Sequence, residues 1–187
     1  MKNKVSLAVM AIVAAGIIRL LPHPHNLTPI GAMALTGGAY LGRKYMAFII
    51  PFVCLFITDF ILNNTVNRVF FTANEGIVIF GKYMLFTYAA FALTVLLGSS
   101  KFLNSSRLTL ILGGAVVSSV LFFVLTNFGT WLTGGIYPKN MGGLLACYAA
   151  GIPFYWNTLL SNLVFTFIIV MGIESAYGYF TAQKVRA

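Results

Sequence analysis

The sequence predicts an all-α integral membrane protein, on the grounds of its composition, its apolar segments and its distribution of charge. Of the 187 residues, 59% are hydrophobic and 8% are charged, and the mean hydropathy is +0.91. An ordinary soluble domain carries about 25% charged residues, so this chain has too little polar surface to cover itself in water. Helices suit lipid because they satisfy their own backbone hydrogen bonds.

Six segments are apolar enough to cross a membrane, for which a helix needs about 20 residues. The first is expected to be a retained helix, since "HPHNLTP" after it offers no small-residue cleavage site for a signal peptidase. In the second and shortest, Pro29 suits the first turn and Gly42 the end. The expected spans, in one transmembrane domain over residues 1–187, are 5–21, 28–41, 45–62, 76–97, 108–131 and 158–180.

A further helix is expected at about 139–150, before the last span, and it is too short to cross a membrane. Tyr137, Tyr148, Tyr155 and Trp156 around it indicate an interfacial or re-entrant position. Two interpretations stay open. The aromatic side chains either anchor the chain at the lipid headgroups or form a lid that stacks on a flat ligand.

Positive charge predicts the orientation of the spans. Six crossings with both ends cytoplasmic leave only Arg68 and Lys139 in the outer loops. The net charge of +9 is spread along the chain in ones and twos, with no basic stripe, which argues against nucleic acid as a partner. The eight basic residues that would then lie inside are Lys2, Lys4, Arg43, Lys44, Lys101, Arg107, Lys184 and Arg186.

The stretch "RLLPHPHNLTPIGAMALTGGAY" at residues 19–40 places unusual polar residues on the outer side in this topology. Arg19, Asp59 and Lys82 are expected at similar depth on that side. An ionisable residue inside a membrane segment is costly and faces a cavity or a partner. These three therefore either line an outward-open pocket, form structural ion pairs, or extend to the headgroups.

The sequence shows few features of a metal site, an enzyme active site or a disulfide. His23 and His25 project to one side of an extended backbone, but no third residue of metal-ligand type lies near them, so we predict no metal site. The chain has only three acidic residues and shows no nucleophile with a base and no phosphate-binding loop, so we predict no enzyme activity and no cofactor. Cys54 and Cys147 fall in apolar segments and predict no disulfide.

Small residues recur at a spacing of four in the first two helices, at Ala11 and Ala15 and at Ala34 and Gly38. Such spacing allows close approach of helices. It serves either packing inside the bundle or docking of another membrane subunit.

The motifs "RLLPHPHNLTPIGAMALTGGAYLG", "PFVCLFITDF", "LTNFGTWL" and "CYAAGIPFYWNTLLSN" resemble those of a bacterial integral-membrane family classed with transport proteins. That family in turn resembles the substrate-binding S components of energy-coupling-factor vitamin transporters. The resemblance implies six helices in the bacterial cytoplasmic (inner) membrane, cytoplasmic ends and a ligand pocket near the outer face. Ala11 and Ala15 would then match the motif that docks on an energy-coupling membrane subunit bound to ATPases. Cys54 would correspond to a cobalt-directed cysteine, or simply be buried.

We therefore expect a membrane protein that binds a small molecule, a vitamin or precursor, from outside for uptake. The alternatives are a structural scaffold of the cell envelope and a carrier driven by an ion gradient through Asp59 or Glu174. The chain lacks a G-x-x-x-x-G-K-[ST] motif, so energy for uptake would come from partner subunits. The expected substrate-binding residues are Arg19, His25, Asn26, Asp59, Asn63, Lys82, Asn127, Trp131, Tyr148 and Asn157.

Overall fold

The computed structural model describes residues 2–41, 44–71, 76–100 and 108–186, and these residues form helices without any strand. Three helices, over Tyr45–Asn64, Leu108–Thr133 and Met141–Phe180, are long and apolar enough to cross a membrane. Of the basic residues expected inside, Arg43, Lys101 and Arg107 lie outside the described ranges. The elements are α1 (Lys2–Ile18), α2 (Ile30–Tyr40), α3 (Lys44–Asn64), the 3₁₀ helix η1 (Val66–Phe71), α4 (Met84–Gly98), α5 (Leu108–Thr133) and α6 (Met141–Arg186).

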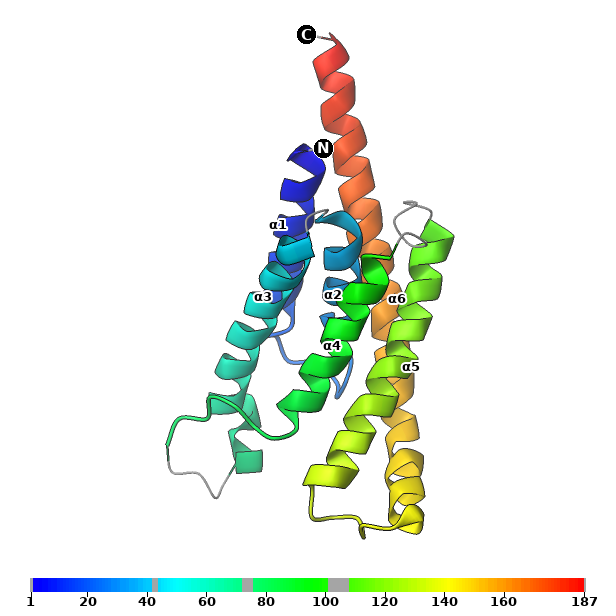
Figure 1. The fold of residues 1–187 in the computed structure, drawn as a ribbon. Helices are drawn as coiled ribbons and strands as arrows, with labels where there is room; N and C mark the ends of the chain where they lie inside the picture. Colours follow the sequence, from blue (N-terminus) through cyan, green and yellow to red (C-terminus); the bar gives the residue numbers. More distant parts are fainter. Residues whose placement is uncertain (1, 42–43, 72–75, 101–107, 187) are drawn as a thin grey trace.

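The α-helices run in alternating directions, so the N-terminus and the C-terminus lie at the same end of the bundle (Figure 1). The connection between α1 and α2 turns back part of the way along the bundle, whereas the hairpin of α5 and α6 continues well past it (Figure 1). The ends of α3 and α5 and the starts of α4 and α6 therefore lie beyond that connection, at the end of the bundle opposite the chain termini (Figure 1).

The short helix α2 occupies the centre of the bundle, with eight of its eleven residues buried. Its side chains Met33 and Ala34 pack with Ile12 of α1, Leu55 of α3 and Phe91 of α4 in the main hydrophobic cluster. A helix that is apolar all round belongs in the interior of a bundle, as α2 does here.

Glycines bring α2 and α4 into backbone contact. A Cβ atom added at Gly38 of α2 would lie 2.3 Å from the Val95 carbonyl oxygen, and one added at Gly98 of α4 would lie 2.2 Å from the Leu35 carbonyl oxygen. Only glycine permits such an approach at both positions. This crossing fixes the position of α2 between its neighbours.

The small residues of α1 serve packing inside the bundle. Ala15 is buried, and Ala11 packs against the main hydrophobic cluster. The exposed face of α1 instead carries Met10, Val13 and Ile17. Of the two interpretations of this spacing, these contacts therefore favour packing inside the bundle, where α1 meets its own neighbours.

The prediction of a separate helix at about 139–150 is wrong, since α6 runs without interruption from Met141 to Arg186. Pro153 lies inside this helix and has no N–H to donate to the carbonyl of Ala149. Cys147 and Gly151 before the proline and Thr158 after it are buried, so the helix packs against the bundle on both sides of Pro153. In lipid, leaving the helix would also expose backbone groups without partners.

The start of α4 also differs from the expected span of 76–97, since the helix begins at Met84. The side chain of Asn64, at the end of α3, pairs with the backbone of Val78: its Oδ1 accepts from the Val78 N–H at 2.9 Å and its Nδ2 donates to the Val78 carbonyl at 2.8 Å. This pairing satisfies the backbone at Val78 outside a helix. Lys82 consequently lies in the turn before α4, where it is exposed.

Replacing Gly38 with Ala tests the crossing of α2 and α4. We expect Gly38→Ala to lower the free energy of unfolding by about 1–3 kcal/mol, because the new methyl group meets backbone atoms that cannot move aside. The measurement is thermal unfolding of the detergent-solubilised protein. Gly113→Ala is the matched control, since Gly113 lies within α5 with no atom in reach of an added Cβ. It should leave stability unchanged or raise it by about 0.5–1 kcal/mol; equal losses in both variants would contradict the assignment.

Candidate functional site

A cavity of about 720 Å³ lies beside the α1–α2 connection. We call it the large cavity. Its lining comes from residues 19–30, from α3 and η1, from the start of α4, and from the facing parts of α5 and α6. Small-molecule sites in proteins commonly occupy about 300–1,000 Å³ and combine apolar walls with a few polar groups. The volume and the mixed lining of the large cavity match that description.

The α1–α2 connection is held in place from α6. The Asn157 side chain donates to the His25 carbonyl at 3.0 Å, and the Ser161 hydroxyl donates to the Asn26 carbonyl at 3.4 Å. Asn26 itself has a φ of 62°, in the left-handed region that asparagine tolerates better than most residues. The irregular backbone beside the cavity thus has a defined course and partners for its carbonyl groups.

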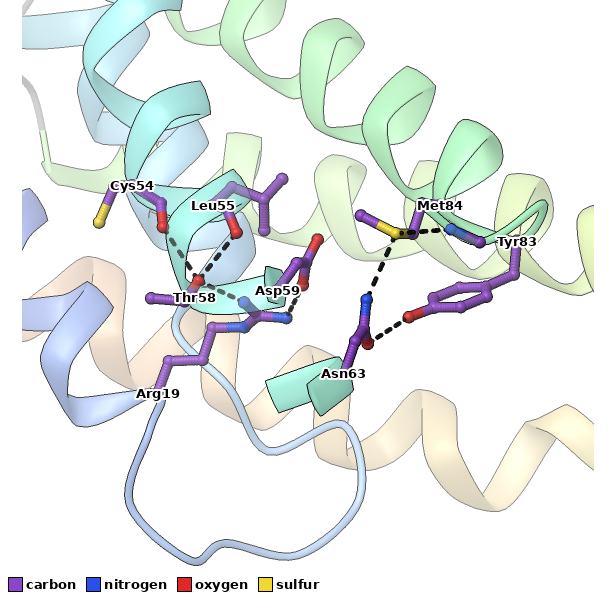
Figure 2. A network of polar contacts seen from close by, with 9 residues as sticks. Arg19, Cys54, Leu55, Thr58, Asp59, Asn63, Tyr83 and Met84 are labelled. Atoms are coloured by element: carbon purple, nitrogen blue, oxygen red, sulfur yellow. Dashed lines mark hydrogen bonds and ion pairs between the residues drawn. The ribbon is translucent and has the colours of Figure 1, made fainter. Parts of the chain in front are cut away.

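Arg19 and Asp59 form a buried ion pair at the edge of the large cavity (Figure 2). The Arg19 guanidinium donates to the Asp59 carboxylate and to the Thr58 hydroxyl. Arg19 is 7% exposed and Asp59 is 5% exposed. Each ion would be costly to bury alone, so the pair joins the end of α1 to α3.

A second polar contact joins α3 to the start of α4 beside the ion pair (Figure 2). The Tyr83 hydroxyl donates to the Asn63 side-chain oxygen at 2.8 Å, and the Asn63 amide donates to the Met84 sulfur at 3.4 Å. Tyr83 lines the large cavity, whereas Asn63 is fully buried behind it. Asn63 therefore holds Tyr83 in its position in the wall of the large cavity.

Charge in the large cavity is balanced over the lining residues that the structure describes. The only Asp, Glu, Lys or Arg side chains among them are Arg19 and Asp59, which neutralise each other. His23 also lines the cavity, and its partial desolvation there, followed by the charge of Arg19, lowers its pKa from the ordinary value of 6.5. His23 is consequently neutral near pH 7.

Half of the expected substrate-binding residues meet in the large cavity: Arg19, His25, Asn26, Asp59 and Asn127 line it. The other five lie outside its lining, and most of them make contacts that support it. These five residues are Asn63, Lys82, Trp131, Tyr148 and Asn157, of which Lys82 is exposed.

Trp131 and Tyr148 hold the α5–α6 hairpin together. The Trp131 indole donates to the Pro138 carbonyl at 2.9 Å, and the ammonium of Lys139 lies over its ring. The Tyr148 hydroxyl donates to the Val124 carbonyl at 2.8 Å and so links α6 to α5. Of the four aromatic residues expected to form a lid or a headgroup anchor, Tyr148 is thus part of the hairpin's own packing, whereas Tyr137 lines the large cavity.

Several lining residues were not among those expected, above all Thr126 and Thr130 on α5 and Phe154 on α6. Thr126 and Thr130 are four residues apart with Asn127 beside them, so they share one helix face. That spacing was visible in the sequence, but nothing in it distinguished this face from one turned to lipid.

The metal-type and thiol side chains that line the large cavity, His23, His25, Asp59 and Cys147, do not form a metal-binding cluster. No cluster of three or more His, Cys, Asp or Glu occurs among the described residues, although His23 and His25 both line the cavity. Cys54 lies against α1 instead, where a Cβ added at Gly16 would be 2.2 Å from its sulfur. Its role in the structure is close packing of α3 on α1.

Breaking the buried ion pair tests its place in the site. We expect Asp59→Asn to lower the free energy of unfolding by about 3–5 kcal/mol, because the Arg19 charge stays buried without its partner. The double variant Arg19→Met/Asp59→Leu should recover most of that loss. Lys4→Met is the control: Lys4 pairs with Glu174 at 2.7 Å, but both side chains are about a third exposed, so the loss should stay below about 1 kcal/mol. The measurement is thermal unfolding of all three variants. A double variant as unstable as Asp59→Asn would show that the loss does not come from the unpaired charge of Arg19.

Comparison with known proteins places the chain in a family without assigning an activity. No curated protein matches the chain, and no solved structure matches it. The model of a family of unknown function, DUF6580, matches residues 1–184 and therefore nearly the whole chain. The protein belongs to this family, DUF6580.

Proposed function

We propose that the protein is a substrate-binding membrane protein that receives a small molecule in the large cavity from the outer side and takes part in its uptake. In this proposal the six α-helices form one bundle that spans the bacterial inner membrane with both ends cytoplasmic, and α2 reaches only part of the way across. The single observation that carries the proposal is a cavity of about 720 Å³ bordered by a helix too short to cross a membrane. The resemblance to S components of vitamin transporters agrees with it.

The length of α2 supports a cavity at membrane depth. Its eleven residues rise only about 16 Å, whereas the hydrocarbon core is about 30 Å thick. With the C-terminal end of α2 near the inner interface, its start and the α1–α2 connection lie inside that thickness. Irregular backbone at such depth is tolerated where it is buried in protein or lines a water-filled cavity. Interrupted helices of this kind border the substrate sites of many transporters.

The arrangement of the termini supports the orientation. Lys4, near the start of α1, pairs with Glu174 on α6, and both lie toward the end of the bundle that carries the two chain ends (Figure 1). Most Lys and Arg residues belong to that end by their sequence positions, which favours a cytoplasmic location. The large cavity is then open on the opposite, outer side.

Energy coupling remains part of the proposal through the resemblance alone. Docking of a coupling subunit through Ala11 and Ala15 gains no support, since Ala15 is buried and Ala11 packs inward. A coupling subunit would instead meet the exposed apolar face of α1, at Met10, Val13 and Ile17.

Two alternatives make different demands on the same residues. A carrier driven by an ion gradient would need an acid free to change its partner, but Asp59 is paired with Arg19 and Glu174 with Lys4. A scaffold protein is favoured by one observation, the buried Arg19–Asp59 pair, which acts as a structural link. The scaffold differs from our proposal in predicting that the large cavity holds no ligand.

Native mass spectrometry of the gently purified protein tests the proposal. We expect a small molecule to remain bound to the natural protein and to be lost from Ala150→Trp. Ala150 lines the large cavity on α6, so the indole would occupy the space of the ligand. Ala149→Trp is the matched control, because the neighbouring Ala149 is also exposed but is not part of the lining.

The outcomes separate the candidates. A bound mass that survives in Ala149→Trp and disappears in Ala150→Trp supports a ligand site in the large cavity. An unliganded natural protein that is also not stabilised by any member of a panel of vitamins and precursors refutes the proposal and favours the scaffold.

A further inference from the structure

The polar side chains in the α5 wall of the large cavity donate their hydrogen bonds within the helix itself. Thr126, Asn127 and Thr130 line the cavity from consecutive positions on one face of α5. Each donates to a backbone carbonyl one turn earlier: Thr126 to Phe122 at 2.7 Å, Asn127 to Phe123 at 2.8 Å, and Thr130 to Thr126 at 3.0 Å. Their donor hydrogens are therefore used within the helix.

This use of hydrogens limits what the wall can offer a ligand. A threonine hydroxyl has one hydrogen and two acceptor lone pairs. Once the hydrogen is committed to the helix, the oxygens of Thr126 and Thr130 can only accept. The Asn127 side-chain oxygen is an acceptor as well, although its amide keeps a second N–H. The α5 wall thus presents mainly acceptors.

Charge restricts the ligand further. The Arg19 guanidinium binds the Asp59 carboxylate and the Thr58 hydroxyl, so the two charges of the pair neutralise each other in the cavity wall. The remaining described lining residues include no other Asp, Glu, Lys or Arg. An ionised group entering this partly enclosed space would lose hydration without gaining a counter-charge. The cavity favours a neutral molecule.

Apolar side chains adjoin the acceptor wall. Phe122 lies one turn before Thr126 on α5, and Phe154 contributes from α6. A ligand with donors on one edge and an apolar ring behind them would therefore contact oxygens and aromatic faces together.

We infer that the large cavity selects an electrically neutral ligand that donates hydrogen bonds from N–H or O–H groups to Thr126 and Thr130, such as a ring-bearing carboxamide or an N–H heterocycle. This inference rests on the proposed function and specifies the chemical class of its ligand. It assigns Thr126 and Thr130 as specificity-determining residues.

Three matched probes test the class: benzamide, N,N-dimethylbenzamide and benzoate. Benzamide is neutral and donates, the dimethyl compound is neutral without donors, and benzoate is anionic without donors. Saturation-transfer nuclear magnetic resonance on the protein in lipid nanodiscs gives their dissociation constants. We expect benzamide to bind about tenfold more tightly than either of the others, as the loss of one or two hydrogen bonds implies.

The variant Thr126→Val/Thr130→Val removes both acceptors while preserving the shape of the wall. It should abolish the preference for benzamide over its dimethyl analogue. Thr133→Val is the control, because Thr133 donates to the Gly129 carbonyl at 2.8 Å in the same manner but lies outside the cavity lining. It should keep the preference unchanged.

The results distinguish a failure of the inferred ligand class from a failure of the proposed function. Tighter binding of benzoate, a preference unaffected by the double valine variant, or binding of none of the three probes overturns the inferred class. A co-purified anion found by native mass spectrometry also overturns the class but leaves the proposed function standing. An unliganded natural protein that also binds no probe and no vitamin overturns both.

Discussion

The central position of α2 is the constraint on which the rest of the structure depends. The helix has eleven residues, and glycine contacts with α4 seat it in the middle of the bundle. It is too short to cross a bilayer, so the chain must turn back within the bundle. Every polar group of that turn then needs a protein partner or water. Asn157 and Ser161 supply partners to two carbonyl groups, and the cavity beside the turn provides room for water or a ligand.

The Arg19–Asp59 pair solves an electrostatic problem that this geometry creates. Arg19 directly follows α1 and is 7% exposed, so its charge needs a counter-ion at that depth. A buried pair contributes little net stability compared with apolar side chains of similar volume, but it penalises any arrangement that separates its members. The pair therefore specifies how α1 meets α3, and it leaves the neighbouring cavity without net charge from these two groups.

The sequence predicted what depends on composition and local pattern, and it could not predict what depends on contacts between helices. The helical class and the approximate places of the helices follow from apolar runs alone. The start of α4 at Met84 depends on Asn64 pairing with Val78, fourteen residues along the chain. Arg19 and Asp59 stood out because ionisable residues are rare in apolar segments. Thr126 and Thr130 did not, because threonines are common in membrane helices and only the bundle shows which face of α5 borders the cavity.

Pro153 gives α6 a point of low bending stiffness, and among the other described helices α3 also has an internal proline, Pro51. The missing N–H leaves the Ala149 carbonyl without its usual bond, so bending stiffness is lowest at this point. Ala150 and Gly151 lie on one side of it and Phe154 on the other, and all three border the large cavity. Tyr148 is tied to Val124, so the arm of α6 before the proline is coupled to α5. Bending at Pro153 would therefore require the adjoining part of α5 to bend with it, and it would change the width of the cavity between the two helices.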